Sequence, residues 1–416
     1  MKPKLITTLR EYSARMFVAD AAAGVTVALV ALPLSIAIAI ASGAAPQAGL
    51  VTAIVGGLLI SALGGSRVQI GGPTGAFIVV VYGVIERFGF DGLLLATIMA
   101  GLILIVAAFA RAGNLIALIP ESVIEGFTVG IALIIGVSQL KDLFGLNIGK
   151  LPSDFADALP VLWASRHSAT LYAAVIGLAS IVAIGLFKRR TGSVLVLVLA
   201  SVAVALWALP VETIESRFGT LQAGLPFPAL PPVSVARIAE LLPSALVIAF
   251  LAGVESLLSA IVADRMIGGS HRSNAELMAQ GVANIASPLF GGLPATGAIA
   301  RTAANVRAGG RTPVAGIVHS LALLMFVLVA APLAGFLAMP AMAALLIVTA
   351  WSMSEPRRWP ERLKARPADR FLLFLTMILT VATNLTVAIA VGTAIGLAQR
   401  LARRDIPPAD WNPDER

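Results

Sequence analysis

The sequence has 416 residues, of which 58% are hydrophobic and only 12% are charged, and its formal net charge at pH 7 is +8. Its mean hydropathy is +0.93, and many apolar runs approach the roughly 20 residues that a membrane-spanning helix needs. This composition excludes soluble classes of protein and predicts a polytopic helical membrane protein. Since the sequence has no cysteine and only three scattered histidines, it also excludes disulfides, thiolate metal sites and a histidine metal cluster.

Fourteen apolar segments follow one another along the chain. Two of them, at 74–86 and 297–307, are too short to cross a hydrocarbon core of about 30 Å, so they predict half-helices. We therefore expect an all-α integral membrane protein with 14 transmembrane segments. The segments lie at residues 18–42, 46–64, 74–86, 91–110, 119–139, 168–187, 193–209, 240–263, 275–290, 297–307, 313–331, 339–353, 370–384 and 386–402.

The distribution of Lys and Arg predicts the orientation of these segments, because short cytoplasmic loops retain positive charge during insertion. With the N-terminus inside, most of the 30 Lys and Arg residues fall in cytoplasmic segments. The positive net charge is then an insertion signal, and no basic surface for nucleic acid is expected. We expect a multi-pass protein of the cell inner membrane, with a cytoplasmic N-terminus (1–17), a transmembrane transporter domain (18–404) and a cytoplasmic tail (405–416).

Two clusters of glycine and proline interrupt the apolar pattern. They read QIGGPTGAFIVVVYG, at 69–83, and FGGLPATGAIARTAANV, at 290–306. Each opens one of the short segments, and the seven-span separation gives the two halves opposite orientations, as in an inverted repeat. Interrupted helices at matching places in two halves indicate a transporter site, and two helix N-termini that face each other can bind an anion. The alternative is that these glycines only allow tight helix packing.

Motifs along almost the whole chain carry a family resemblance. They read, in order, LPLSIAIAIASGAAPQAGL, GGPTGAF, SVIEGFTVGIALI, VESLLSAIVAD and ATGAIARTAANV. In this order and spacing the sequence resembles the SulP sulfate permease family of anion transporters. The resemblance implies a seven-plus-seven inverted repeat, in which a core domain (spans 1–4 and 8–11) moves against a gate domain (spans 5–7 and 12–14). It also implies a cytoplasmic sulfate-transporter and anti-sigma-antagonist domain after the last span. The sequence ends shortly after that span, which fits either natural absence of the domain or its removal.

The resemblance also implies a set of substrate-binding residues. Arg301 follows Gly297 by four residues, one turn into the second half-helix, and in the family an arginine here supplies positive field behind the anion. An alternative role is a static salt bridge with Glu255. Leu34 on the first span is a further candidate. The main members of the set are Ile38, Thr74, Gly75, Ala76, Gly297, Ala298, Ile299, Ala300 and Arg301.

An acidic residue in the eighth span is the candidate for ion coupling. Glu255 lies in mid-span, and Ser259 at i+4 shares its helical face. An intramembrane carboxylate is a functional hypothesis by default, and the resemblance implies that Glu255 binds the coupling cation with help from Ser259. A desolvated carboxylate can equally carry a proton, and the apolar neighbours favour H+ over Na+. The alternative is a structural hydrogen bond between helices.

Four other ionisable residues have structural interpretations. Glu121 and Glu125 begin the fifth span, where a carboxylate stabilises a helix N-terminus, so a structural role is favoured over gating. We expect His319 to be a packed histidine rather than a proton relay. Asp20 is predicted to cap the first span at the cytoplasmic face.

The function predicted from these features is secondary active transport of a small anion: sulfate, bicarbonate or a dicarboxylate such as fumarate. We expect proton-coupled symport by alternating access in the lipid bilayer, with H+ or Na+ as the coupling ion, no cofactor, no metal and no enzyme activity. The sequence leaves the oligomeric state open, and a homodimer is one of the candidates. Two alternatives remain, namely a nucleobase permease of the same fold and an uncoupled anion channel or exchanger.

Overall fold

The computed structural model describes residues 2–114, 120–187, 192–383 and 385–403, and these residues are mostly helical. Six of the described helices are long and apolar enough to cross a membrane, or seven if a bent pair counts as one span. The number of segments that cross the membrane therefore stays a prediction. Helices do occupy the places where apolar segments were expected, within the described ranges, while parts of 119–139 and 370–384 lie outside those ranges.

The N-terminal part of the chain runs to the short helix that follows the predicted fifth span. A continuous helical span over 46–63 contains a π-helical stretch in its middle. The elements are α1 (Lys4–Thr8), η1 (Leu9–Glu11), α2 (Ala14–Ala41), α3 (Pro46–Val51), η2 (Thr52–Gly56), α4 (Gly57–Leu63), β1 (Gly71–Gly72), η3 (Gly75–Phe77), α5 (Ile78–Phe109), η4 (Ala112–Asn114), α6 (Glu121–Ser138) and α7 (Leu140–Leu143).

The rest of the chain contains a 33-residue helix, α12, and three short helices that the sequence did not predict, namely α8, α11 and α17. Its elements are α8 (Phe155–Ala164), η6 (Ser165–Ser168), α9 (Leu171–Leu186), α10 (Gly192–Leu206), α11 (Ile214–Phe218), α12 (Val235–Ile267), α13 (Ser273–Leu289), β2 (Thr296–Gly297), α14 (Ile299–Ala308), α15 (Pro313–Ala334), α16 (Met339–Met353), η7 (Pro356–Arg358), α17 (Trp359–Lys364), α18 (Pro367–Ala382) and α19 (Leu385–Arg403).

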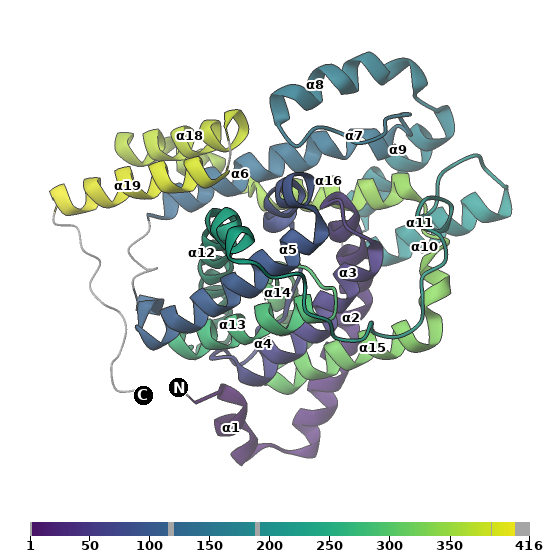
Figure 1. The fold of residues 1–416 in the computed structure, drawn as a ribbon. Helices are drawn as coiled ribbons and strands as arrows, with labels where there is room; N and C mark the ends of the chain where they lie inside the picture. Colours follow the sequence, from purple (N-terminus) through teal and green to yellow (C-terminus); the bar gives the residue numbers. More distant parts are fainter. Residues whose placement is uncertain (1, 115–119, 188–191, 384, 404–416) are drawn as a thin grey trace.

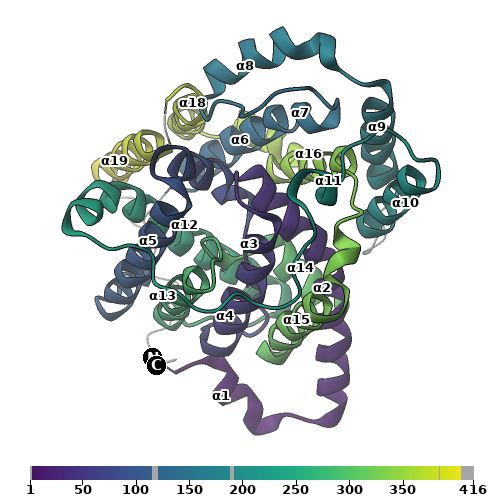
Figure 2. The ribbon, with the colours of Figure 1, turned by 45° about the vertical axis from the view of Figure 1, so that its right-hand side comes forward.

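The helices pack in two sets. In the first set, α13 and α12 pack against α5, α15 packs against α2, and α14 lies between α2 and α12. In the second set, α18 packs against α6 and α19, and α16 packs against α6 and α9. Figure 1 shows α6, α18 and α19 along the upper side and α4, α13 and α15 below them. In Figure 2, α9 and α10 lie side by side at one edge, far from α5 and α13.

The predicted third and fourth segments meet without a separate loop. Helix α5 covers both, and the bend between them is at Gly89, which has φ 72° and ψ 177°. This backbone conformation is costly for any residue with a Cβ, so a glycine lets the chain turn between two helical stretches. The expected separation into 74–86 and 91–110 is therefore present as a bend within α5.

The two glycine clusters meet as a pair of strands, which the sequence did not predict. Strand β1 pairs with β2 in antiparallel register, with Gly71 opposite Gly297 and Gly72 opposite Thr296. Each strand has only two residues, so it is too short for the alternating pattern by which a strand is recognised. The starts of η3 and α14 therefore flank the strand pair, within the first set of helices.

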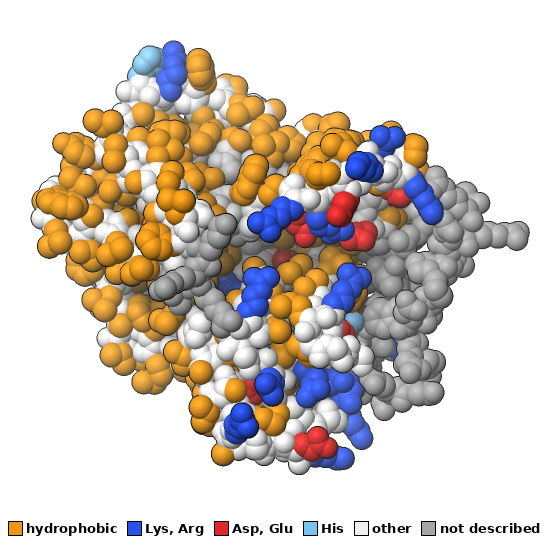
Figure 3. Space-filling view, turned by 180° about the vertical axis from the view of Figure 1, so that it is seen from behind, with side chains coloured by type: hydrophobic (Ala, Val, Ile, Leu, Met, Phe, Trp, Pro, Cys, Tyr) orange, Lys and Arg blue, Asp and Glu red, His pale blue; other side chains and the backbone are white. Residues whose placement is uncertain are grey.

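Hydrophobic side chains cover a large part of the surface, and charged side chains gather in another part (Figure 3). Leu171, Leu206 and Val329 are each at least 75% exposed to solvent. A soluble monomer rarely exposes apolar patches of this extent. The surface is that of a protein whose helices face lipid.

The expected role of Asp20 is wrong. Helix α2 begins at Ala14 and is capped by the Ser13 hydroxyl, which accepts a hydrogen bond from the Met16 amide. Asp20 is fully buried in the helix and accepts hydrogen bonds from the Arg311 and Thr312 amides at 2.7 and 3.2 Å. Its carboxylate therefore ties α2 to the start of α15. The helix starts earlier than expected because serine at Ser13 is itself a favoured cap.

Candidate functional site

The strand pair positions two helix N-termini that no side chain caps. Thr74 precedes the turn η3, Ala298 precedes α14, and neither makes a side-chain capping hydrogen bond. The first N–H groups of a helix lack acceptors within the helix, and together they carry a partial positive charge. Because β1 and β2 are antiparallel, the chain leaves them in opposite directions, so the two starts flank the strand pair.

Arg301 lies in the first turn of α14 and is only 3% exposed. Its Nη2 donates a hydrogen bond to the Ser35 hydroxyl of α2 at 3.1 Å. Its Nε and Nη1 have no hydrogen-bond partner in the described part of the chain. A buried guanidinium with unpaired donors is costly, so this arrangement provides positive charge for which no protein acceptor is in place.

Gly72 makes room for this arginine. Its φ is 148°, and a Cβ at this position would lie 2.3 Å from Nη1 of Arg301. Both the backbone conformation and the close approach therefore require glycine at Gly72. The cluster of glycines that interrupts the apolar pattern thus has a local reason, because β1 must pass directly over a guanidinium group.

Glu255 of α12 faces the first helix start. Its Oε2 accepts a hydrogen bond from the Thr74 hydroxyl at 2.8 Å, and its side chain is partly exposed. Among the described residues, Glu255 makes no ion pair with Arg301, although the two groups interact electrostatically. The alternative of a static Glu255–Arg301 salt bridge is therefore not what the structure shows. Its carboxylate instead lies against Thr74, one of the predicted substrate-binding residues.

Ser259 lies one turn further along α12 and contacts α14. Its hydroxyl shares a hydrogen bond of 3.2 Å with the Thr302 hydroxyl, which also accepts from the Ile70 amide at 3.1 Å. Ser259 is fully buried, in contrast to the partly exposed Glu255. This serine therefore joins α12, α14 and the residue before β1.

Three polar residues that the sequence analysis missed hold β2 against α12. The Ser256 hydroxyl accepts a hydrogen bond from the Gly297 amide at 3.0 Å and lies 2.8 Å from the Thr296 hydroxyl. The Gln69 side chain donates to the Ser256 carbonyl at 3.3 Å, and its Nε2 would lie 1.5 Å from a Cβ at Gly297. Buried hydroxyl and amide groups in an apolar span were the available signal, since buried polar groups must find partners.

The two helix starts differ in exposure. At the start of α14, Ile299 is 38% exposed and Ala300 is exposed as well. Before η3, Thr74 is buried, and Gly75 is partly exposed. The remaining predicted lining residues are buried apart from Leu34, which is partly exposed; they are Ile38, Ala76, Gly297 and Ala298.

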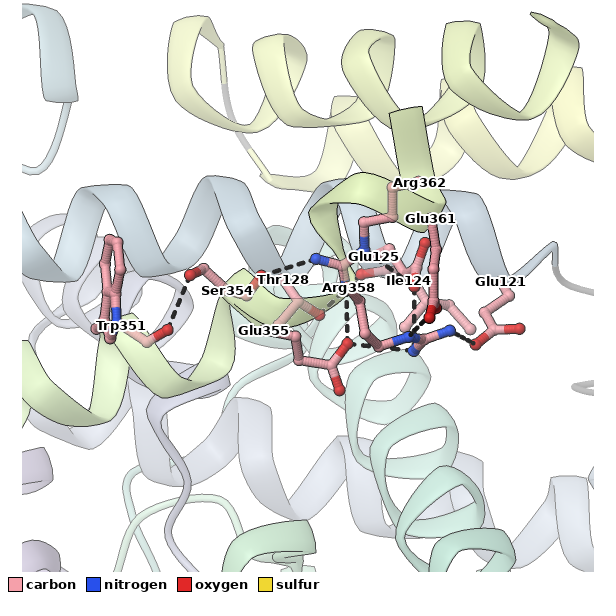
Figure 4. Close-up of polar contacts among 10 residues, drawn as sticks. All are labelled: Glu121, Ile124, Glu125, Thr128, Trp351, Ser354, Glu355, Arg358, Glu361 and Arg362. Carbon is pink, nitrogen blue, oxygen red and sulfur yellow. Dashed lines mark hydrogen bonds and ion pairs between the residues drawn. The ribbon is translucent and has the colours of Figure 1, made fainter. Parts of the chain in front are cut away.

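Glu121 and Glu125 take part in an ionic cluster at the start of α6. Arg358 reaches Glu121 at 3.1 Å and Glu125 at 3.2 Å, and Arg362 Nε lies 3.1 Å from Glu125 Oε1. Figure 4 shows these groups pointing toward one another between α6 and the segment that follows α16. The contacts are those of a structural tie between helices, in line with the interpretation of these two acids as structural.

His319 lies on α15 and is fully buried. Within the described residues neither of its ring nitrogens has a hydrogen-bond partner. A proton relay needs hydrogen-bonded neighbours on both sides, so this geometry favours the packed histidine that the sequence predicted.

A bundle of apolar helices around two interrupted, uncapped helix starts is the architecture of a membrane transporter. The sulfate permease family model matches residues 17–376. The Bacillus subtilis protein named "Putative sulfate transporter YvdB" is 41% identical over 381 residues, which are 90% of this chain and 72% of that protein. The bicarbonate transporter BicA of Picosynechococcus is 30% identical over 386 residues, or 88% of this chain and 67% of that protein. The chain belongs to the sulfate permease family.

Solved structures agree with this membership. The transmembrane domain of a cyanobacterial BicA matches with a TM-score of 0.82 and 28% identity, over 91% of this chain and 98% of that one. The structure of SLC26A9 matches with a TM-score of 0.86 at 19% identity, over 96% of this chain and 68% of that one, which shows the fold alone. The family resemblance is confirmed, and because the relatives are named as transporters, the expectation of a transporter and not an enzyme is confirmed as well.

Proposed function

We propose that the protein is a secondary active transporter that couples the uptake of a small anion to protons. The observation that carries this proposal is the contact between Glu255 and Thr74 at an uncapped helix start. An acid that can take up a cation and a site that can bind an anion are thereby joined by one hydrogen bond. Sulfate, bicarbonate and a dicarboxylate such as fumarate are the proposed substrates, and relatives named for sulfate and bicarbonate transport support the first two.

The anion binds between the two helix starts in this proposal. The backbone amides at Thr74, Gly75 and Ala76 and those of Ile299 and Ala300 supply hydrogen-bond donors, and the exposed start of α14 supplies access. Gly297 and Ala298 line the site without donating, because their amides already bond to the Ser256 hydroxyl and the Ile70 carbonyl. Arg301 adds a full positive charge behind these partial charges, and its Nε and Nη1 are free of protein acceptors in the described chain. Ile38 and Leu34 complete the wall on the side of α2.

Glu255 provides the coupling in this proposal. An uncompensated charge cannot cross the low-dielectric part of the membrane cheaply. If the anion binds while Glu255 is ionised, the loaded site carries the negative charges of both against the single charge of Arg301. A proton on Glu255 removes one of them, so anion and proton cross together. Ser259 supports the position of α12 through its contact with Thr302.

Alternating access follows from the two sets of packed helices. We propose that the first set, which corresponds to spans 1–4 and 8–11, is a core domain that carries the site. The second set, spans 5–7 and 12–14, is the gate domain against which the core moves. The loaded site is then exposed in turn on each side of the bilayer, with both chain termini on the cytoplasmic side of the inner membrane.

A nucleobase permease of the same architecture is less well supported. Such a site would need carboxylates on both α12 and α14 to hold an amide-bearing ring. Helix α14 contains no Asp or Glu over Ile299–Ala308, and it supplies an arginine instead. The charge of this arginine favours an anionic substrate.

Transport by purified protein in liposomes tests the proposal. Labelled sulfate, bicarbonate and fumarate are offered with an imposed pH gradient, with a Na+ gradient and with neither. Accumulation that depends on the pH gradient is the expected result. Accumulation that depends on Na+ alone would identify Na+ as the coupling ion. Uptake that depends on neither gradient would indicate a channel or exchanger. Absence of any anion flux would contradict the proposal.

A further inference from the structure

A methionine of the second set of helices lies against the start of η3. A Cβ at Gly75 would lie 3.0 Å from Sδ and 3.7 Å from Cε of Met353, the last residue of α16. The same position would lie 3.7 Å from Cδ1 of Ile135 on α6. Two helices of the proposed gate domain thus bring apolar side chains to a proposed anion-binding residue of the core domain.

The end of α16 is held in place by Arg362. Its Nη1 donates to the Ser354 carbonyl at 2.7 Å, and its Nη2 lies 2.6 Å from Oε2 of Glu355. Glu355 has φ 45° and ends the helical conformation directly after Ser354. Because Arg362 is only 5% exposed, these contacts are largely removed from water, and they determine where Met353 lies.

The same guanidinium connects α16 to α6. Arg362 Nε lies 3.1 Å from Glu125, in the second turn of α6, the helix that also carries Ile135 (Figure 4). The ionic cluster therefore sets the relative position of the two helices that touch Gly75. A buried ion pair adds little net stability, because desolvation offsets the attraction of the two charges, so what matters at this place is the geometry that the pair holds.

From this arrangement we propose that Met353 sets the size of the anion that the site accepts, and that the Glu125–Arg362 pair positions it. The inference rests on the proposed function. A methionine side chain is flexible and uncharged, and partly exposed Met353 fills space directly beside Gly75. A small anion fits against the amides with this side chain in place, whereas a longer dicarboxylate must displace it.

Selectivity of transport tests the role of Met353. Met353→Ala enlarges the space, so the ratio of fumarate to bicarbonate uptake should rise by about tenfold, the scale on which a few carbon atoms in an apolar pocket discriminate. Met353→Phe should lower the same ratio. Met325→Ala is the matched control, because Met325 of α15 is 59% exposed, and it should leave the ratio unchanged.

A second measurement does not depend on transport. The chain has no native cysteine, so Met353→Cys and Met325→Cys each introduce a single thiol. A negatively charged methanethiosulfonate reagent should react with the Met353→Cys variant, and added sulfate or bicarbonate should slow that reaction. The reaction of the Met325→Cys variant should not respond to the anion.

A comparison of single and double variants tests the role of the Glu125–Arg362 pair. Glu125→Gln should shift the uptake ratio in the same direction as Met353→Ala, and the double variant should shift it no further, since both changes act through one side chain. Glu361→Gln is the control, because Glu361 is exposed and lies 4.0 Å from Arg358. Additive effects of Glu125→Gln and Met353→Ala would show that the pair does not act through Met353.

The outcomes separate this inference from the proposed function. If the unsubstituted protein carries no anion, the proposed function fails and the inference fails with it. If it carries anions but Met353→Ala and Met353→Phe keep its size preference, only the inference is overturned. If added anion does not slow the reaction of the Met353→Cys variant, the inference is overturned as well. This measurement still applies if the Met353→Phe variant does not fold.

Discussion

At the scale of single residues, Arg301 is a full charge at a site otherwise built from partial charges. Its guanidinium donates one hydrogen bond, to the Ser35 hydroxyl, and lies against Gly72, and its Nε and Nη1 have no hydrogen-bond partner among the described residues. An uncapped helix start contributes only about half an elementary charge. Arg301 should therefore account for much of the affinity of the site for an anion.

Arg301→Ala should weaken anion binding by about 10- to 100-fold. This range corresponds to the roughly 1.5–3 kcal/mol that a hydrogen bond to a charged group contributes. Isothermal titration or a thermal-shift assay with sulfate and bicarbonate measures the change. Arg307→Ala is the control, since Arg307 lies on the same helix and is exposed. Unchanged affinity in a folded Arg301→Ala variant would remove this residue from the site.

Glu255→Gln should separate binding from coupling. Glutamine imitates the neutral acid and can still hydrogen-bond to the Thr74 hydroxyl, so anion binding and anion exchange should persist. Accumulation driven by a proton or sodium gradient should be lost, because the side chain can no longer gain and release a cation.

The measurement is uptake into liposomes with the gradient imposed and then collapsed by an ionophore, for the variant and the unsubstituted protein side by side. Gradient-dependent accumulation by the Glu255→Gln variant would place the coupling site elsewhere. Glu125 and His319 would then be the next acid and base to replace.

At the scale of elements, the pairing of β1 with β2 brings the two glycine-rich segments together in one candidate site. Its register places Gly297 between Gln69 and Ser256, and there is no room for a side chain. The Gly297 amide donates to the Ser256 hydroxyl of α12, and the Ile70 amide just before β1 donates to the Thr302 hydroxyl of α14. The backbone amides at the start of α14 are thus held by contacts to helices that are distant in the sequence.

Gly297→Ala should disturb this arrangement, and Gln69→Ala should relieve it. The added methyl group would lie 1.5 Å from Nε2 of Gln69, and overpacking of this kind costs about 1–3 kcal/mol. We expect a lower melting temperature and weaker anion binding for Gly297→Ala, with partial recovery of both in the double variant. Gly83→Ala is the control, because a Cβ at Gly83 meets nothing within 4 Å. If Gln69→Ala gave no recovery, the contact with Gln69 would not be the reason for glycine at this place.

The sequence predicted the positions of the helices better than the contacts between them, and the roles of the candidate site residues stay predictions. Apolar runs, glycine clusters and intramembrane charges are local signals, and together with the family resemblance they led to Arg301, Glu255 and Thr74, which the structure places around the strand pair. The pairing of β1 with β2 has no local signal, because two residues show no periodicity. The contact of Glu255 with Thr74 instead of Arg301 likewise depends on tertiary packing, which no spacing along the chain encodes.

At the scale of the whole molecule, the proposed mechanism needs a defined orientation in the bilayer. The segment from Ser354 to Arg366 is rich in Arg and Lys, which is the signal that keeps a loop in the cytoplasm. The long connection from α11 to α12, at 219–234, contains no Lys or Arg and four prolines. On this basis we predict that the two connections lie on opposite sides of the membrane, with the first inside.

Single cysteines test this orientation directly, because the chain has none of its own. Phe227 in the α11–α12 connection is 95% exposed, and Lys364 at the end of α17 is exposed as well. A membrane-impermeant maleimide added to intact cells should label the Phe227→Cys variant and leave the Lys364→Cys variant unlabelled until the membrane is permeabilised. The reverse pattern would invert the topology, and labelling of both from outside would contradict an arrangement with these connections on opposite sides. Either result would change which side of the membrane each end of the site faces, and with it the predicted direction of proton-driven anion transport.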